Sequence, residues 1–158
     1  MRKISILALF VGGVVSFFSA AILAIPFGML ATLKVDHAKW ASPTLLSEAV
    51  RSIILSTPGL YYGGVGIDCA CCILGGYLAA VTARRNESLN GLAASLLFVA
   101  VEIFGMNQHI DPHPLPVHVL HVLGIVLGSW LGGYLRGAQV RKSRGKNTLD
   151  RFGAITRA

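Results

Sequence analysis

Charged side chains are scarce in this chain. Asp, Glu, Lys and Arg make up 13% of its 158 residues, whereas hydrophobic residues make up 54%. Soluble proteins carry about 25% charged residues, so this composition argues against a soluble domain. The charge that is present is mostly basic, with a formal net charge of +7. Most of it flanks apolar segments, so we expect anionic lipid headgroups, and not nucleic acid, as its partner.

Cysteine is also rare, and its positions exclude two common uses. Cys69, Cys71 and Cys72 all lie inside one apolar segment. That is the wrong place for the disulfide framework of a secreted protein, and C-x-C-C is not the spacing of a zinc ribbon. No motif in the chain specifies a reaction. We therefore expect a protein that is not an enzyme and that carries no cofactor.

Long apolar segments make up most of the remaining sequence. A helix needs about 20 residues to cross the hydrocarbon core of a bilayer. Four segments are suited to this, so we predict an all-α membrane protein with a bundle of four transmembrane helices in residues 1–140. The helices are expected over about residues 4–33, 58–81, 90–106 and 117–135.

The first apolar segment begins like a signal peptide, with basic residues directly before it. The apolar part of a signal peptide covers about 7–15 residues, and this segment is roughly twice as long. We therefore expect an uncleaved transmembrane helix. Pro26 lies within it, and a proline there is expected to kink the helix or to mark a change of direction.

Basic residues at the ends of the segments indicate their orientation, because cytoplasmic loops are enriched in Lys and Arg. Most of these residues fall on one side of the predicted bundle. We therefore place both termini in the cytoplasm, with residues 141–158 as a basic cytoplasmic tail. The residues expected to contact lipid headgroups are Arg84, Arg85, Arg136, Arg141 and Lys142.

The polar stretch after the first segment contains a short amphipathic pattern over residues 43–55. Ser42 and Pro43 are typical of the N-cap and first position of a helix. Two interpretations stay open. The stretch is a helix that lies in the membrane interface with Trp40 as an anchor, or it is an N-terminal extension of the second transmembrane helix.

Two of the predicted helices end in similar sequences. GGYLAAVTARR at Gly75–Arg85 matches GGYLRGAQVRK at Gly132–Lys142. The match indicates either a tandem repeat of helical hairpins or convergence on the same packing and interface residues. The first of these endings resembles one found in small bacterial four-helix membrane proteins of uncharacterised function. The resemblance covers about fifteen residues. It implies a multi-pass protein of the bacterial inner membrane and brings no activity or site with it.

Small residues recur at four-residue spacing within the helices. Such stripes let helix backbones approach closely in lipid. Because all four helices carry them, our first hypothesis is a non-enzymatic structural or assembly protein, which forms a homo-oligomer or joins a larger membrane complex. The residues expected at helix contacts are Gly64, Cys72, Gly76, Gly124, Gly128 and Gly132.

Two carboxylic acids lie inside apolar segments, where charge is unfavourable and therefore rare. Counted from the cytoplasmic ends of their helices at 1.5 Å per residue, Asp68 lies about 20 Å deep and Glu102 about 18 Å. Their equal depth suggests that they share a proton, bind a cation or relay protons, as in a small transporter or channel. The alternative is a pair of neutral carboxyls that only form hydrogen bonds between helices.

Histidines gather where the third and fourth helices are joined. Neutral imidazole is a ligand for zinc, copper, iron and haem, so a metal- or haem-binding protein that uses His118 and His121 is a third hypothesis. The spacing matches no established metal motif, and a polar loop with interfacial histidines explains it equally well. The candidate metal ligands are His109, His113, His118 and His121.

Overall fold

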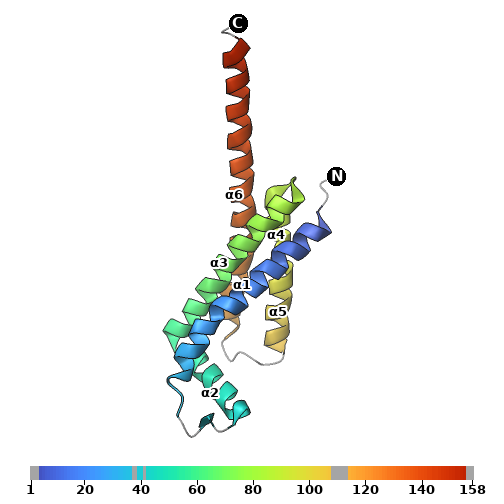
Figure 1. Cartoon of the computed structure of the whole chain (residues 1–158). Helices are drawn as coiled ribbons and strands as arrows, with labels where there is room; N and C mark the ends of the chain where they lie inside the picture. The colour runs from blue at the N-terminus through green and yellow to red at the C-terminus, as the bar shows by residue number, and fades with distance from the viewer. Residues whose placement is uncertain (1–3, 37–38, 41, 108–113, 156–158) are drawn as a thin grey trace.

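The computed structural model describes residues 4–36, 39–40, 42–107 and 114–155, and no strand occurs in these residues. Figure 1 shows a helical bundle from which one helix projects. Four parts of the chain are long and apolar enough to cross a membrane, which confirms the predicted all-α fold with four helices of that kind. The helices are α1 (Ile6–Thr32), α2 (Pro43–Ser56), α3 (Pro58–Ala83), α4 (Glu87–Ala94), α5 (Leu96–Asn107) and α6 (Leu115–Ile155).

Helix α3 lies at the centre of the bundle and packs against α1, α4 and α6. The interior is built from small side chains, and Ala8, Ala79 and Ala94 form one buried cluster. Large apolar side chains point outward instead: Phe10 is 64% exposed and Leu127 is 60% exposed. Such an outer surface suits lipid, which is as apolar as the side chains themselves.

The glycines of the predicted stripes mostly lie where two helices approach each other. Gly91 of α4, which belongs to no predicted stripe, is confined as well: a Cβ atom added there would lie 2.7 Å from Cα of Gly133 in α6, closer than non-bonded atoms approach. Gly76 is equally confined by the backbone of Ser129. Added Cβ atoms at Gly124, Gly128 and Gly132 would all meet α3, and Cys72 is fully buried.

Gly64 differs from the other predicted packing residues. A Cβ atom added there would meet no atom of the described chain within 4 Å. Gly64 and Gly76 belong to the same stripe of four-residue spacing in the sequence, and that pattern predicts a helix contact at both. Twelve residues turn an α-helix about 120° beyond three full turns, so the two glycines point in different directions. At Gly64 the structure has a cavity instead.

The third membrane-spanning segment is not the single helix over residues 90–106 that the sequence predicts. It begins earlier, at Glu87, and consists of α4 and α5 with Ser95 between them. Both the backbone N–H and the hydroxyl of Ser95 donate to the carbonyl of Leu92, at 3.1 and 2.8 Å. A serine that bonds a nearby carbonyl in this way offers the backbone an alternative to the regular helix.

Asn90 does not open the third segment but joins three parts of the chain. Its carboxamide oxygen accepts from the backbone N–H of Ser5 at 2.8 Å, directly before α1. Its nitrogen donates to the carbonyls of Arg85 and Asn86 in the α3–α4 turn, at 2.9 and 3.2 Å. Asn90 is fully buried. A polar side chain is tolerated there because its donors and its acceptor are all bonded.

Helix α6 is longer than predicted. The expected end near residue 135 is passed without a break, and the helix continues to Ile155, well beyond the bundle (Figure 1). The part predicted as a basic tail is therefore helical as far as residue 155. No proline follows Pro116 in the sequence, and Lys, Arg and Gln are good helix formers.

Helix α2 is a separate helix and not an extension of the second transmembrane helix. Thr57 between α2 and α3 is extended, with φ −100° and ψ 104°, and Pro58 begins α3. None of the residues of α2 is buried against the described chain. Helix α1, in contrast, continues through Pro26 to Thr32, so this proline does not end the helix.

Candidate functional site

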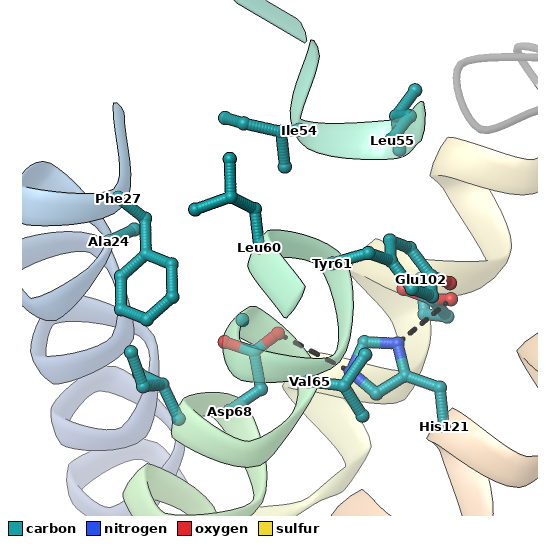
Figure 2. A pocket seen from close by; sticks show the side chains of 12 residues that line it. Ala24, Phe27, Ile54, Leu55, Leu60, Tyr61, Val65, Asp68, Glu102 and His121 are labelled. Carbon is teal, nitrogen blue, oxygen red and sulfur yellow. Dashed lines mark hydrogen bonds and ion pairs between the residues drawn. The ribbon is translucent and has the colours of Figure 1, made fainter. Parts of the chain in front are cut away.

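Three polar side chains from three different helices meet inside the bundle. His121 of α6 lies between Asp68 of α3 and Glu102 of α5 (Figure 2). Its Nδ1 is 3.3 Å from Oε1 of Glu102, and its Nε2 is 3.3 Å from Oδ2 of Asp68. The imidazole ring therefore bridges two carboxyl groups that belong to separate membrane-spanning segments.

A second histidine completes this cluster. His118 lies three residues before His121 on α6, so both rings point from the same face of the helix. Nδ1 of His118 is 2.9 Å from the same Oε1 of Glu102. An ionised Glu102 accepts a hydrogen bond from both Nδ1–H groups, which is the arrangement that satisfies all three atoms at once. His118 is 4% exposed and His121 is 9% exposed, so water screens these contacts little.

Among the described residues, the Nε2 atom of His121 is the one fully buried side-chain nitrogen or oxygen without a hydrogen-bond partner. Oδ2 of Asp68 is close enough for an ion pair, but its orientation does not meet the geometry of a hydrogen bond. Hydrogen bonds weaken steeply when misaligned, so this contact stabilises the pair little as a hydrogen bond. A buried polar atom without a partner is unfavourable by about 1–3 kcal/mol.

The same geometry calls for a proton between His121 and Asp68. When Nδ1 donates to Glu102, the neutral ring presents a lone pair at Nε2. An ionised Asp68 would then face that lone pair with a second acceptor at 3.3 Å. A proton on either atom removes the conflict, because it turns one acceptor into a donor. One proton shared between His121 and Asp68 would therefore satisfy both atoms.

A cavity of about 270 Å³ opens beside the cluster. Asp68, Glu102 and His121 lie on its polar side, and the remaining wall is apolar (Figure 2). Helices α1, α2, α3, α5 and α6 all contribute residues. The apolar and small residues of the wall are Ala24, Phe27, Ile54, Leu55, Leu60, Tyr61, Gly64, Val65 and Ile67.

Two local features of the sequence shape this cavity. Gly64 lies one helical turn before Asp68, and its missing side chain leaves free the space that a larger residue would fill. Helix α2 crosses the end of the bundle and contributes Ile54 and Leu55 to the wall. The short amphipathic helix therefore covers part of the cavity, in addition to any contact that it makes with lipid.

The structure joins what the sequence presents as two separate candidates. The carboxyl pair and the histidine pair form one cluster, and His121 provides the connection between the carboxyls. The depth estimate used for Asp68 and Glu102 could have found it. Counted from the predicted end of its helix at residue 135, His121 lies about 21 Å deep, level with both carboxyls.

The other predicted site residues are not part of the cluster. His109 and His113 lie outside the described residues. Arg84, at the end of α3, adopts a left-handed conformation with φ 54°. Arg141 lies over the ring of Tyr134, 5.8 Å from its centre. Contact of these and the other predicted basic residues with lipid headgroups stays a prediction.

Metal binding finds little support in the geometry. Both Nδ1 atoms of the histidine pair point at one carboxylate oxygen, which leaves them engaged with Glu102. Among the described residues, no group of three His, Cys, Asp or Glu side chains is placed to hold a metal ion.

The fold and this cluster define the class of the protein in broad terms. It is an all-helical chain whose four long apolar helices are those of a multi-pass membrane protein, with ionisable groups enclosed between three of them. Comparison with protein-family models, with curated proteins and with solved structures gave no match to this chain.

Proposed function

We propose that this protein is a small proton-coupled membrane transporter, and that Asp68, His121 and Glu102 are its proton-binding site. One observation carries the proposal: each ring nitrogen of His121 faces a different carboxyl group at 3.3 Å. Ionisable groups inside a membrane are energetically costly and therefore rare, and those that occur usually have a function. Chains of Asp, Glu and His form the proton relays of pumps and transporters.

The proton movement follows from the atoms in place. A proton on the carboxyl group of Asp68 passes to Nε2 of His121, and the proton on Nδ1 leaves to Oε1 of Glu102. The ring remains neutral overall, and the proton has moved from α3 to α5. In the present geometry the first link is misaligned. A small rotation of the Asp68 side chain would therefore connect or disconnect the relay.

The packing of the bundle weakens the case for our first hypothesis, a pure assembly protein. That hypothesis rests on small-residue stripes in all four predicted helices, more than one bundle obviously needs. Contacts within the chain account for most of them, because Gly12 meets Gly75 of α3, Gly76 meets Ser129 of α6, and Gly132 meets Ile73 of α3. The stripes therefore no longer argue for assembly with other chains. The buried ionisable cluster, in contrast, is not explained by packing alone.

The proposal is tested by proton flux into proteoliposomes that hold the purified full-length protein. A pH-sensitive dye inside the vesicles reports flux after a pH step with a potassium diffusion potential. We expect saturable flux for the wild type and at least a tenfold loss in Asp68→Asn, His121→Gln and Glu102→Gln. Each change keeps size and polarity but removes the titrating group.

The matched control is Glu48→Gln, the same chemical change on an exposed residue of α2 outside the cluster. It should keep the wild-type flux. Size-exclusion profiles of all variants establish that the fold is retained. Wild-type protein that conducts no protons under any imposed gradient, or flux that survives in all three cluster variants, would refute the proposal.

A further inference from the structure

We infer that the cavity beside the cluster binds a small organic cation with an apolar body, and that this cation exchanges with the proton. The inference rests on the proposed function and adds a substrate class to it. It starts from the cavity of about 270 Å³, in which one wall is acidic and the others are apolar.

The charge of the cavity selects a cation. Two carboxyl groups line it, from Asp68 and Glu102, and among the described residues no Lys or Arg does. The one basic group in the wall is His121, whose Nε2 atom is buried without a hydrogen-bond partner. When both histidines are neutral, the site holds negative charge in surroundings of low dielectric constant, which repels anions and attracts cations.

The shape and chemistry of the remaining wall favour an organic cation over a metal ion. Phe27 and Tyr61 provide aromatic rings on two sides, and Leu60 and Val65 add aliphatic surface (Figure 2). Aromatic rings attract ammonium groups, and the attraction grows when water is excluded. A metal ion such as Ca²⁺ needs six or more oxygen ligands, and this wall cannot supply them.

The size of the cavity limits the cation to a small one. Sites for drug-sized molecules have about 300–1,000 Å³, so a cavity of about 270 Å³ suits one aromatic ring with a short ammonium group. Such a molecule would place its charge beside Asp68 and its ring between Phe27 and Leu60. The free space at Gly64 lies along the same wall.

Cation and proton compete because they neutralise the same carboxyl group. A proton on Nε2 of His121 pairs with Asp68 and removes the charge that would hold the cation. Among the described residues, the titratable groups that face His121 are Asp68 from α3 and Glu102 from α5, with His118 on its own helix behind Glu102; Tyr61 of α3 also lines the cavity and carries a phenol. The wall residues from α1 and α2 carry no titratable group. Binding of one species therefore releases the other.

The test measures equilibrium binding of radiolabelled benzyltrimethylammonium to full-length protein in lipid nanodiscs. Its charge does not depend on pH. Neopentylbenzene, a neutral molecule of the same shape, and phenylmethanesulfonate, an anion of similar size, serve as competitors. We expect saturable binding of the cation and at least tenfold weaker competition by the other two. Equal competition by the neutral molecule would overturn the inference. This competition experiment uses only the wild-type protein, so it does not depend on whether a variant folds.

Two pairs of variants and a pH series complete the test. Asp68→Asn should weaken cation binding at least tenfold, and Glu48→Gln should not. Gly64→Leu should fill the cavity and abolish binding, whereas Gly66→Leu should leave it intact, because Gly66 also has free space but lies outside the wall. Affinity should fall as the pH is lowered, and His121→Gln should remove this fall. Unchanged binding in both Asp68→Asn and Gly64→Leu would place the cation elsewhere.

The outcome separates this inference from the proposed function. Proton flux without cation binding refutes the inference and leaves the relay standing. Cation binding without proton flux, even with a gradient of benzyltrimethylammonium across the membrane, supports the site but refutes proton coupling.

Discussion

Asn90 illustrates how a single buried polar side chain can hold this bundle together. Its one carboxamide connects the start of α1 to the turn between α3 and α4. Hydrogen bonds in an apolar interior are strong in isolation, and an unmade one leaves a buried group without water to replace the partner. The cluster at His121 is the opposite case, because one of its atoms is left without such a bond.

We predict that Asn90→Ala lowers stability by about 1–3 kcal/mol, because the N–H of Ser5 loses its acceptor and two carbonyls lose a donor. Thermal unfolding in detergent, followed by circular dichroism, measures the change. Asn86→Gly is the control. The side chain of Asn86 caps no backbone group, and glycine readily adopts its φ of 50°. A melting temperature of Asn90→Ala equal to that of the wild type would show that the three bonds contribute nothing.

At the level of the helix, glycine has two distinct roles in this chain. At most positions of the stripes it permits contact between helices, as at Gly76 and Gly132, and it does the same at Gly91. At Gly64 it leaves space for the cavity. A sequence pattern cannot distinguish the two, because spacing along one helix does not tell which neighbour, if any, lies opposite.

We predict that Gly91→Ala destabilises the bundle by about 1–3 kcal/mol, since its methyl group would overlap the backbone of α6. Gly28→Ala on α1 is the matched control. Nothing in the described chain lies within 4 Å of a Cβ atom there, and alanine favours helix over glycine by about 0.5–1 kcal/mol. Urea- or heat-induced unfolding of both variants gives the comparison. Equal stability of the two would show that α4 and α6 can move apart freely.

The helices were predictable to the extent that their signal is local. The apolar segments identify the spans, and Pro43 and Pro58 begin α2 and α3 as the sequence indicates. The break at Ser95 was missed because no proline marks it and a serine there is equally compatible with an unbroken helix, as Ser16 in α1 shows. The cluster around His121 was missed as a unit because its formation depends on how α3, α5 and α6 are rotated about their own axes, which no single segment encodes.

At the level of the whole molecule, the start of α1 and the far part of α6 lie at one end of the bundle, and α2 lies at the other (Figure 1). The number of spans explains this arrangement, since four crossings return the chain to its starting side. Which side faces the cytoplasm follows only from the distribution of basic residues, and it stays a prediction.

We predict that the end carrying Arg84 and Arg141 faces the cytoplasm. Green fluorescent protein fused after Ala158 should fluoresce, and alkaline phosphatase fused at the same site should be inactive. Alkaline phosphatase fused after Ser56, at the end of α2, should be active, because that end would face outward. Reversed activities at the two sites would overturn the orientation.

The continuity of α6 gives the molecule a mechanical property. His121 and Ile155 belong to one unbroken helix, so about 50 Å of stiff rod separates the cluster from the far end. A tilt of about 5° at the cluster would sweep that end through about 4 Å. Any ligand or proton that shifts His121 would therefore act on a lever arm. A shift of the His121 backbone by a few tenths of an ångström would become a displacement of several ångströms at the far end of α6, large enough for another molecule at the membrane surface to sense.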